Sequence, residues 1–551
     1  MSKNKSFFIL LPIIVSLIFA GGLYIGNKLG NNQTYNGNKS FSLPLGSGNK
    51  LNDIINYIDN EYVDDVQKET LLDEAIQNVL QNLDPHSHYI TAADIQALNE
   101  PLEGSFDGIG VQFSIQKDTV VVITPVNGGP SEKVGVKAGD RIVAVDKEVI
   151  AGVAISNQKV MKLLKGAKGS IVNITVLRNQ TKTVDFTISR DAIPINSVDI
   201  AYMLNQETGY LKISRFAKNT YNEFLSSSTK LVNTGMQKMI LDLRGNGGGY
   251  MDAATNIIDE FLPKGALIVY TEGRARPRKS YKATRKSSLE SIELIVLIDE
   301  GSASASEIIA GAIQDNDRGL IVGRRSFGKG LVQEQSSWPD GSATRLTIAR
   351  YYTPSGRCIQ RPYDNGTEDY HQNMADRISN GELYEKDSIP LSDTLAYKTK
   401  NGRTVYGGGG ITPDVFVPVD SIGNTFYFSE LIYRGAFYRF AFNYSDKNRN
   451  TLAGLGEVDA YEEYFNNNSQ VILSAFLSFS DSSGIVKNDV EYTRSKAKIV
   501  SRLKAQIARN IWDDEGFYPL YNQTDYTINT ALGYLERPLS LKLPQVESNA
   551  F

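Results

Sequence analysis

The chain has 551 residues, of which 41% are hydrophobic and 22% charged, so it can bury several cores and we expect three or four globular units. Its formal net charge of −4 offers no broad attraction for nucleic acid, and no nucleic-acid partner is expected. The single cysteine, Cys358, excludes an internal disulfide, and only three histidines are available for catalysis or metal binding.

The amino terminus begins with an apolar segment. After Lys3 and Lys5, an uncharged run from Phe7 to Ile25 would form a helix of about 28 Å, close to the roughly 30 Å hydrocarbon core of a bilayer. The run is longer than the core of a usual signal peptide, so an anchor is favoured over a signal peptide for residues 1–27, followed by a polar linker at 28–50. The positive residues before the run predict that the bulk of the chain is translocated across the membrane. We therefore expect a protein of the cell envelope whose main part lies on the periplasmic or extracytoplasmic side.

Residues 51–104 are predicted to be mostly helical, with apolar residues at helical spacing from Thr70 to Leu83. His86 and His88 follow in the motif LDPHSHY. Their i, i+2 spacing, without Cys, Asp or Glu partners at ligand distance, argues against zinc, and we expect no metal and no organic cofactor.

Residues 105–190 have the pattern of a small β-rich unit. We expect strands at Val120–Val126 and Ile171–Leu177. Between them we expect a turn at Gly135–Asp140 and a helix at Ser156–Leu164. The motif GIGVQF, from Gly108 to Phe113, has two glycines that allow the backbone to turn its N–H groups outwards. In isolation, this motif is better explained as a glycine turn before an ordinary strand.

A glycine-rich loop follows the next predicted strand. The strand runs from Gln237 to Leu243, and the loop in LDLRGNGGG leads to a helix that starts near Asp252. A phosphate-binding loop is a weaker interpretation, because neither G-x-x-x-x-G-K-[ST] nor G-x-G-x-x-G is present.

Three serines occupy a predicted strand-to-helix turn. An apolar run at Glu293–Ile298 precedes DEGSASASE, and a helical pattern continues at Ile308–Ile313. A helix start offers backbone N–H groups that stabilise developing negative charge, which suits the nucleophile of an acyl-transfer enzyme. Taken alone, however, Ser304 to Glu307 spells S-x-x-E and is more simply a capping box, and spacing does not choose among Ser302, Ser304 and Ser306.

A serine nucleophile needs a base, and the histidines occur in unpromising contexts. Lys329, in SFGKGLVQ, could serve if burial lowers its pKa from about 10.4 towards neutrality. If residues 329–335 form a strand, Lys329, Leu331 and Gln333 share one face, and Gln333 could hold the amine. Without further context, an exposed loop lysine between glycines is the simpler interpretation.

The last third of the chain is less informative. The polar stretch 364–401 lacks apolar periodicity and is expected to be an exposed excursion. Residues 420–551 differ in composition from the preceding part of the chain, with many aromatic residues and alternating charges. They are expected to form a separate, mostly helical module, with a helix over Asp489–Trp512.

Eight motifs, in this order, resemble the carboxyl-terminal processing peptidases, also called tail-specific proteases. They are LDPHSHYI, GIGVQF, VKAGDRIVAVD, LDLRGNGGG, GSASASEI, SFGKGLVQ, YYTPSGRCIQ and GGGGITPDV. The resemblance implies an α/β multidomain protein: a ClpP/crotonase-like α/β protease core at 191–419, an inserted PDZ domain at 105–190, the amino-terminal helical segment and the carboxyl-terminal helical module at 420–551. The resemblance is weakest in that last module.

The resemblance also implies a mechanism. It makes Ser304 the nucleophile, Lys329 the base and Gln333 the residue that orients the lysine, with oxyanion donors from the N–H groups of Gly248 and Ala305. The family often has proline where this chain has Gly247. Asp315, about 16 Å along the helix from Ser304, is too distant for direct chemistry and is interpreted as structural.

For the PDZ domain, the resemblance implies that Gly108, Ile109, Gly110 and Val111 form the loop that binds a terminal carboxylate. The expected function is a serine endopeptidase that captures exposed carboxyl termini of polypeptides and cleaves them, with the PDZ domain able to gate the core. The alternative is a non-catalytic or gated PDZ scaffold or chaperone. The helical module could mediate a homodimer or bind an adaptor.

Overall fold

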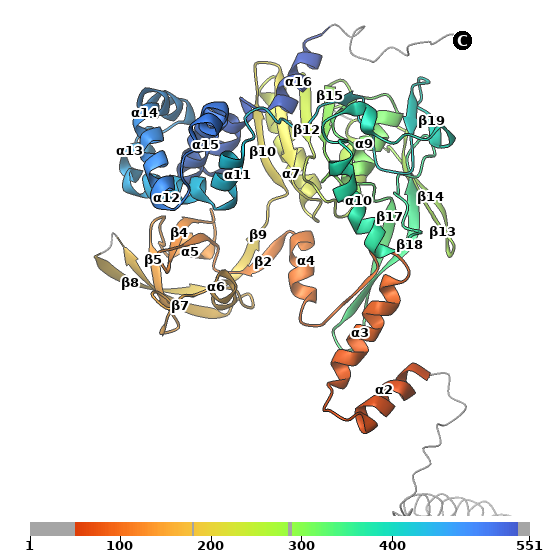
Figure 1. The fold of residues 1–551 in the computed structure, drawn as a ribbon, viewed down its shortest axis with the longest axis horizontal. Helices are drawn as coiled ribbons and strands as arrows, with labels where there is room; N and C mark the ends of the chain where they lie inside the picture. Colours follow the sequence, from red (N-terminus) through yellow and green to blue (C-terminus); the bar gives the residue numbers. More distant parts are fainter. Residues whose placement is uncertain (1–49, 179–180, 285–288, 538–551) are drawn as a thin grey trace, which may run out of the picture. The chain divides into compact units, whose positions relative to one another are not determined.

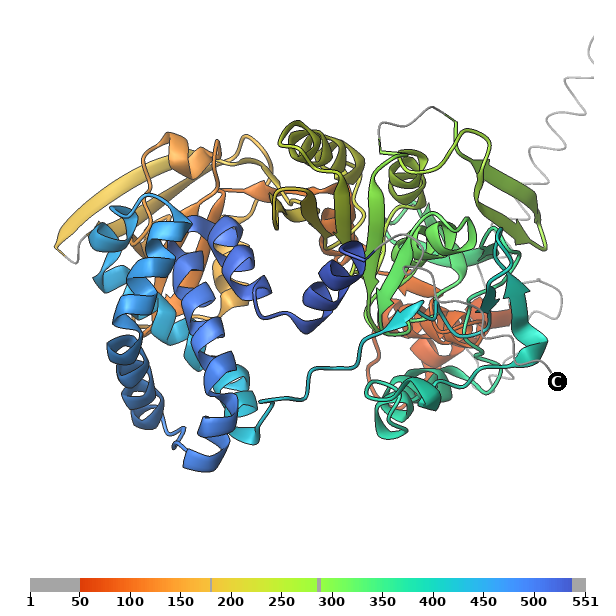
Figure 2. The ribbon, with the colours of Figure 1, turned by 90° about the horizontal axis from the view of Figure 1, so that it is seen from above.

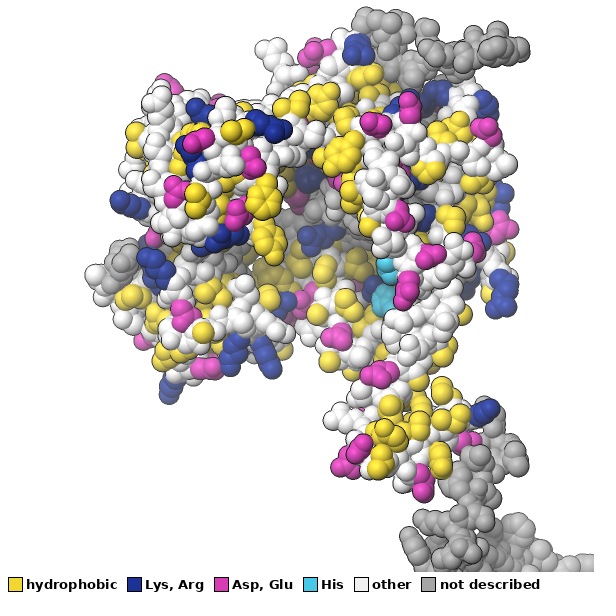
Figure 3. All heavy atoms as spheres, viewed as in Figure 1, with side chains coloured by type: hydrophobic (Ala, Val, Ile, Leu, Met, Phe, Trp, Pro, Cys, Tyr) yellow, Lys and Arg dark blue, Asp and Glu magenta, His cyan; other side chains and the backbone are white. Residues whose placement is uncertain are grey.

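The computed structural model describes residues 50–178, 181–284 and 289–537. The chain divides into two compact units, 1–75 and 76–551. The predicted membrane segment lies outside the described residues, and within them no helix is long and apolar enough to cross a bilayer. Helix α2 (Lys50–Glu61) opens the described chain and is followed by α3 (Lys68–Gln81). Apolar side chains of α2 such as Leu51, Ile54 and Tyr57 are exposed (Figure 3).

The protease region is built on a six-stranded sheet, in the order β10-β11-β12-β15-β16-β21 (Figure 1). All neighbours are parallel except the antiparallel pair β10 and β11. The strands are, in that order, Val198–Met203, Thr208–Ile213, Lys238–Asp242, Glu293–Ile298, Leu320–Gly323 and Val415–Phe416.

Side chains on both faces of this sheet are buried, as expected for parallel strands that carry apolar runs such as LIVLI in β15. Alternate residues of each strand enter different clusters, Leu241 facing one and Ile240 the other. Helices α7 (Thr220–Asn233), α8 (Met251–Asp259) and α9 (Ala305–Asp315) contribute to the first cluster, and α16 (Tyr526–Leu535) contributes to the second.

A second sheet presents the lysine loop. Its central strand β18 (Ala343–Tyr352) pairs with β1, β13 and β17, and β14 pairs with β13. The other strands of this sheet are β1 (His88–Ile90), β13 (Leu267–Gly273), β14 (Arg276–Lys282) and β17 (Leu331–Ser337). Strand β17 begins at Leu331, so the expected strand over 329–335 is wrong at its start, and a register shift after Val332 interrupts the simple alternation of faces.

The β-rich unit forms its own sheet, in the order β3-β4-β5-β7-β8 with β6 paired to β5. The strands β3 to β8 are Val111–Gln116, Thr119–Pro125, Arg141–Val145, Glu148–Val149, Ile171–Arg178 and Lys182–Ser189. Helices α5 (Pro130–Lys133) and α6 (Asn157–Leu164) accompany it, and Ser156 caps α6 through its side chain. Helix α4 (Ile95–Glu103) and the paired strands β2 (Ser105–Gly108) and β9 (Asp191–Pro194) flank the unit in sequence.

The carboxyl-terminal region is helical, as expected (Figures 1 and 2). Its helices pack round a core of their own that is rich in aromatic residues. Helices α11 to α15 are Phe426–Tyr433, Ala436–Lys447, Arg449–Ala453, Val458–Ser482 and Asp489–Asn522. Helix α15 is broken at Trp512 and Asp513, where the backbone leaves helical geometry, and this is where the predicted helix ended.

The polar stretch 364–401 is not simply an exposed excursion, and that expectation was wrong. It contains helix α10 (Thr367–Ser379), short 3-10 turns at Lys386–Ser388 and Asp393–Leu395, and strand β19 (Ala396–Lys398), which pairs with β20 (Thr404–Tyr406). Tyr370 and Arg377 of α10 are buried. Arg377 can be buried because it pairs with Glu382 and donates to two backbone carbonyls.

Candidate active site

The serine turn connects β15 to α9 and holds its middle serine in a strained conformation. Ser304 has φ +54° and ψ −112°, a backbone geometry that residues with a side chain rarely adopt. Its backbone N–H donates to Glu307 Oε2 at 2.8 Å, and Ser304 and Glu307 together form a capping box at the start of α9. The capping interpretation of S-x-x-E is therefore confirmed, and the same Ser304 also lines the active-site cavity.

The other two serines of the motif are tied to the glycine loop. Ser302 Oγ donates to the Leu243 carbonyl at 2.8 Å, and Ser306 Oγ donates to the Asn246 carbonyl at 2.9 Å. Both side chains are fully buried. Geometry thus distinguishes Ser304 from its neighbours, which spacing alone did not.

Lys329 lies in the loop before β17 with its amine held by a glutamine. Lys329 Nζ donates to Gln333 Oε1 at 2.9 Å, and Gln333 Nε2 donates to the His86 carbonyl at 2.6 Å. Burial lowers the pKa of Lys329, and the Arg345 guanidinium lowers it further, against the opposing effect of nearby carboxylates. A larger fraction of this amine is therefore neutral at physiological pH than for an exposed lysine.

The LDPHSHY loop fixes the carbonyl that orients Gln333. Asp84 accepts hydrogen bonds from the backbone N–H groups of His86 and Ser87, and the His86 ring contacts the Tyr370 hydroxyl at 2.8 Å. Burial lowers the pKa of His86 to about 4, with the charge of Lys329 adding to the effect. No cluster of His, Cys, Asp and Glu suitable for a metal ion occurs in the described parts of the chain.

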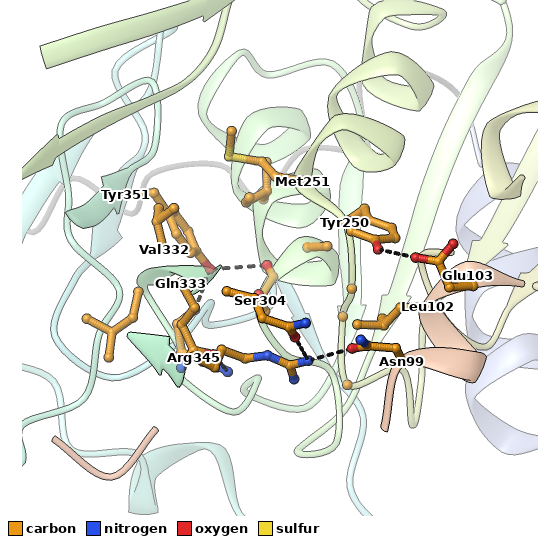
Figure 4. A pocket seen from close by; sticks show the side chains of 18 residues that line it. Asn99, Leu102, Glu103, Tyr250, Met251, Ser304, Val332, Gln333, Arg345 and Tyr351 are labelled. Carbon is orange, nitrogen blue, oxygen red and sulfur yellow. Dashed lines mark hydrogen bonds between the residues drawn. The ribbon is translucent and has the colours of Figure 1, made fainter. Parts of the chain in front are cut away.

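The predicted catalytic residues meet in one cavity of about 470 Å³ (Figure 4). Its lining includes all five residues predicted for catalysis and the oxyanion hole, Ser304, Lys329, Gln333, Gly248 and Ala305. Among the described residues, the Lys329 amine is hydrogen-bonded to Gln333 and not to the Ser304 hydroxyl. Such a gap between nucleophile and base is common in enzymes without substrate.

The glycine loop passes beside the serine turn. A Cβ on Gly248 would lie only 2.7 Å from Ser304 Cβ, and its φ of +101° also favours glycine. The Gly248 N–H donates to Asn246 Oδ1 at 2.8 Å, so in this conformation it is engaged within its own loop. The N–H of Ala305, at the start of α9, has no hydrogen-bond partner among the described residues.

Glu307 was not predicted as a site residue, yet its carboxylate joins the serine and lysine loops. It accepts hydrogen bonds from the N–H groups of Ser304, Gly328 and Lys329 at 2.7–2.9 Å and from the Ser326 hydroxyl at 2.5 Å. Burial raises its pKa to about 7, although these hydrogen bonds oppose the rise. The S-x-x-E spelling was the available signal, but it was interpreted only as a helix cap.

A second network that the sequence did not reveal supports the start of the glycine loop. Arg244 Nη2 donates to Asp242 Oδ2 at 2.7 Å, and Arg244 Nη1 donates to both oxygens of Asp525, at 2.9 and 3.1 Å. Tyr210 also donates to Asp242 at 2.6 Å. Burial alone would raise the pKa of Asp242, but Arg244 and Lys212 hold it well below its ordinary range. Asp525, 281 residues from Arg244, thus contributes to the support of the loop.

Asp315 and Cys358 lie outside the lining of the cavity. Asp315 pairs with Arg357 at 2.7 Å, with both side chains fully buried. Burial raises the pKa of the Cys358 thiol, which disfavours a thiolate. The geometry of both residues suits structural roles.

The predicted carboxylate-binding loop is separate from the cavity and connects β2 to β3. Its carbonyl groups are tied down: Ile109 O accepts from Ser131 Oγ at 2.6 Å, and Gly110 O accepts from the Val126 N–H at 2.9 Å. Gly110 has φ +70°. Strand β3, which starts at Val111, is at the edge of its sheet and pairs only with β4 among the described strands. Such an edge can accept an added peptide strand.

Comparisons with known protein families match three regions of the chain. Residues 207–369 match peptidase family S41, residues 108–189 match the PDZ domain, and residues 427–513 match a family of unknown function. The carboxy-terminal processing protease CtpA of Bacillus subtilis is 31% identical over 358 residues, covering 65% of this chain and 75% of that protein. The carboxy-terminal-processing protease of Bartonella bacilliformis is 35% identical over 317 residues, 56% of this chain and 72% of that protein.

Among solved structures, the photosystem II D1 C-terminal processing protease is 28% identical and matches 68% of this chain and 95% of its own, with a TM-score of 0.35. Each of the two relatives above is more than 30% identical to this chain over more than two thirds of its own length. The chain belongs to the carboxy-terminal processing proteases, serine peptidases of family S41 that carry a PDZ domain.

Proposed function

We propose that Ser304 and Lys329 cleave peptide bonds through an acyl-enzyme, with Gln333 holding the lysine in position. One observation carries this assignment: a serine in a strained conformation and a lysine amine of lowered pKa line the same cavity. A neutral amine can accept the serine proton, which an exposed, charged lysine cannot.

In the proposed reaction, Ser304 Oγ attacks the peptide carbonyl while Lys329 Nζ takes its proton. Lys329 then donates that proton to the leaving amine, and an ester of Ser304 remains. Lys329 next accepts a proton from water, whose oxygen attacks the ester, and returns the proton to Ser304 as the carboxylic acid leaves.

We assign the oxyanion to the N–H of Ala305, where the N-terminal dipole of α9 assists, and to the N–H of Gly248. Because Gly248 N–H is bound to Asn246 Oδ1, the assignment requires the glycine loop to release it when substrate arrives. The closeness of Gly248 to Ser304 supports this choice.

We further propose that a free carboxyl terminus adds as a strand to β3 and places its carboxylate on Gly108, Ile109, Gly110 and Val111. Its binding would shift the core towards a conformation in which Lys329 reaches Ser304. Cleavage that is insensitive to deletion of residues 105–190 would count against this gating.

The domain limits and the class of the core are also part of the proposal. The parallel sheet with helices on both faces supports a ClpP/crotonase-like core over 191–419. The apolar run near the amino terminus supports an envelope protein whose core lies outside the cytoplasm, by anchor or by signal peptide. Fractionation of cells that express the full chain tests the location.

The test of the mechanism uses an unfolded reporter with an apolar free carboxyl terminus and the full chain. We expect wild type to cleave it, Ser304→Ala and Lys329→Ala to lose cleavage, and the exposed control Lys264→Ala to retain it. An ester-linked intermediate at Ser304, trapped by rapid acid quench, should be visible by mass spectrometry. Unchanged cleavage in both site variants would refute the dyad, and binding without cleavage by wild type would favour the scaffold function.

A further inference from the structure

A positive charge in the active-site cavity has no carboxylate partner. Arg345, on β18, extends along the cavity wall, and its guanidinium lies between Asn99 and Gln335 (Figure 4). Nη2 donates to Gln335 Oε1 at 2.9 Å and to Asn99 Oδ1 at 3.3 Å. Both acceptors are uncharged amide oxygens, so they orient the guanidinium without neutralising it.

Some partly buried arginines of this protein pair with a carboxylate, whereas others, such as Arg318, bond only to carbonyl groups among the described residues. Arg325 pairs with Glu382, and Arg403 pairs with Asp414. No carboxylate of the described chain lies within 4.0 Å of the Arg345 guanidinium nitrogens, as the ion pairs of the structure show. Arg345 therefore differs from Arg325 and Arg403 in its lack of a carboxylate partner, and from Arg318 in that it lines the active-site cavity.

In the part of the chain that the structure describes, the lining of the cavity offers no free carboxylate to Arg345. Within the described residues, its lining contains one carboxylate, Glu103, which pairs with Lys218 and accepts a hydrogen bond from Tyr250 at 3.3 Å. Arg345 is therefore not matched by any free carboxylate there. Burial disfavours the charged form of Arg345, yet a guanidinium keeps its proton in proteins, so a bound anion would relieve an existing cost.

A carboxylate is the anion that a polypeptide supplies, and it matches the planar donor fork of arginine. We propose that Arg345 is a carboxylate-binding subsite of the cleavage cavity, which selects substrates with an acidic group close to the bond that is cut. The inference rests on the proposed function of the cavity. The carboxylate has two possible sources, an Asp or Glu side chain or the free terminal carboxylate of a short tail.

The experiment compares isosteric peptides on the full chain. One set carries Glu or Gln at each of three positions on either side of the scissile bond, and a second set ends in a free acid or an amide. The measured quantity is the ratio of kcat/KM for the acid to that for its amide. Because this ratio is taken within one enzyme, any effect of Arg345 on the pKa of Lys329 cancels.

For wild type we expect a ratio of about ten to one hundred at one position, which is the usual strength of a charge-assisted hydrogen bond. Arg345→Gln should reduce the ratio to about one, Arg345→Lys should keep part of it, and Arg345→Glu should favour Lys at that position. Arg350→Gln is the matched control, since Arg350 is exposed on the same strand, bonds to Tyr363 and does not line the cavity.

Binding provides a second measurement that needs no cleavage. In the Ser304→Ala background, fluorescence anisotropy should show tighter binding of the acidic peptide by a similar factor, lost with Arg345→Gln. Preference at an internal position identifies a side chain as the source, whereas preference for the terminal acid that Arg345→Gln abolishes identifies the chain end.

The subsite is refuted if wild type shows no acid preference in either measurement, or if Arg345→Gln leaves the preference unchanged. A terminal-acid preference that survives Arg345→Gln belongs to the PDZ loop and also counts against the subsite. Ser304-dependent cleavage without acid preference would reject the subsite and leave the proposed protease function intact. Acid-selective binding without cleavage would support the subsite and reject that function.

Discussion

Replacing Glu307 by glutamine should remove a pH dependence from the stability of the catalytic core. The buried carboxyl has its pKa raised from an ordinary 4.5 to about 7. Between these values the folded protein holds a proton that the unfolded chain has released. Glu307 therefore stabilises the fold most below pH 4.5, and this contribution is lost as the pH rises through 7. At about 1.4 kcal/mol per pH unit, the loss is roughly 3 kcal/mol.

Glu307→Gln cannot ionise, so its stability should lack this dependence. The variant also presents an amide NH₂ to N–H donors that now bond to a carboxylate, which shifts its stability at every pH. The informative quantity is therefore the change with pH: the free energy of unfolding of wild type, minus that of the variant, should fall by about 3 kcal/mol between pH 4.5 and pH 8.

Because the protein has several domains, the assay should report on the core alone. Hydrogen exchange of peptides that cover residues 302–309 and 326–331, corrected for intrinsic rates, gives the local opening free energy. A Ser304→Ala background prevents self-cleavage in every sample, and Glu368→Gln, which removes an exposed carboxyl, is the control. A difference that stays constant from pH 4.5 to pH 8 would refute the reasoning.

Three further predictions concern activity and stability. The kcat/KM of wild type should increase with pH through the lowered pKa of Lys329, because only the neutral amine accepts a proton, and a profile that falls with pH would contradict the assigned base. Asp525→Asn keeps the side-chain cap of α16 but removes one of the two carboxylates that pair with Arg244. We therefore expect the free energy of unfolding of the core, measured by urea denaturation, to fall by about 1–3 kcal/mol. Asp525→Glu, which keeps the carboxylate, should lose less. An unchanged urea midpoint would show that the Asp525–Arg244 pair does not stabilise the core. Gly249→Ala would place a Cβ 2.1 Å from a backbone carbonyl oxygen and should lower the melting temperature and abolish cleavage, whereas Gly247→Ala, which meets nothing within 4 Å, should do neither.

Much of the fold was predictable because the elements have strong local signals. The apolar run Glu293–Ile298 and the helical spacing that follows Asp489 correspond to β15 and to the start of α15. Long-range polar pairing was not predictable in the same way. The buried Arg377 of α10 depends on Glu382 and on carbonyl groups from another loop, so the local polarity of its segment suggested exposure.

The candidate site shows the same division. Sequence motifs and family resemblance indicated Ser304, Lys329 and Gln333, since these residues occur in short, recognisable stretches. The supporting contacts join distant parts of the chain: the His86 carbonyl holds Gln333 across 247 residues, and Asp525 reaches Arg244 across 281. No periodicity or spacing in one sequence encodes such pairs, which arise only when the two sheets and α16 assemble.

The position of α16 has a consequence for the order in which the protein can mature. Its side chains Ile528, Ala531 and Leu535 cover the face of the core sheet that Ile240, Ile295 and Leu297 present. A growing chain that has reached residue 525 would contain the serine, the lysine and the glycine loop, but this sheet face would still be open to water. The core sheet is therefore fully covered only after residues 526–535 have been synthesised and have folded onto it.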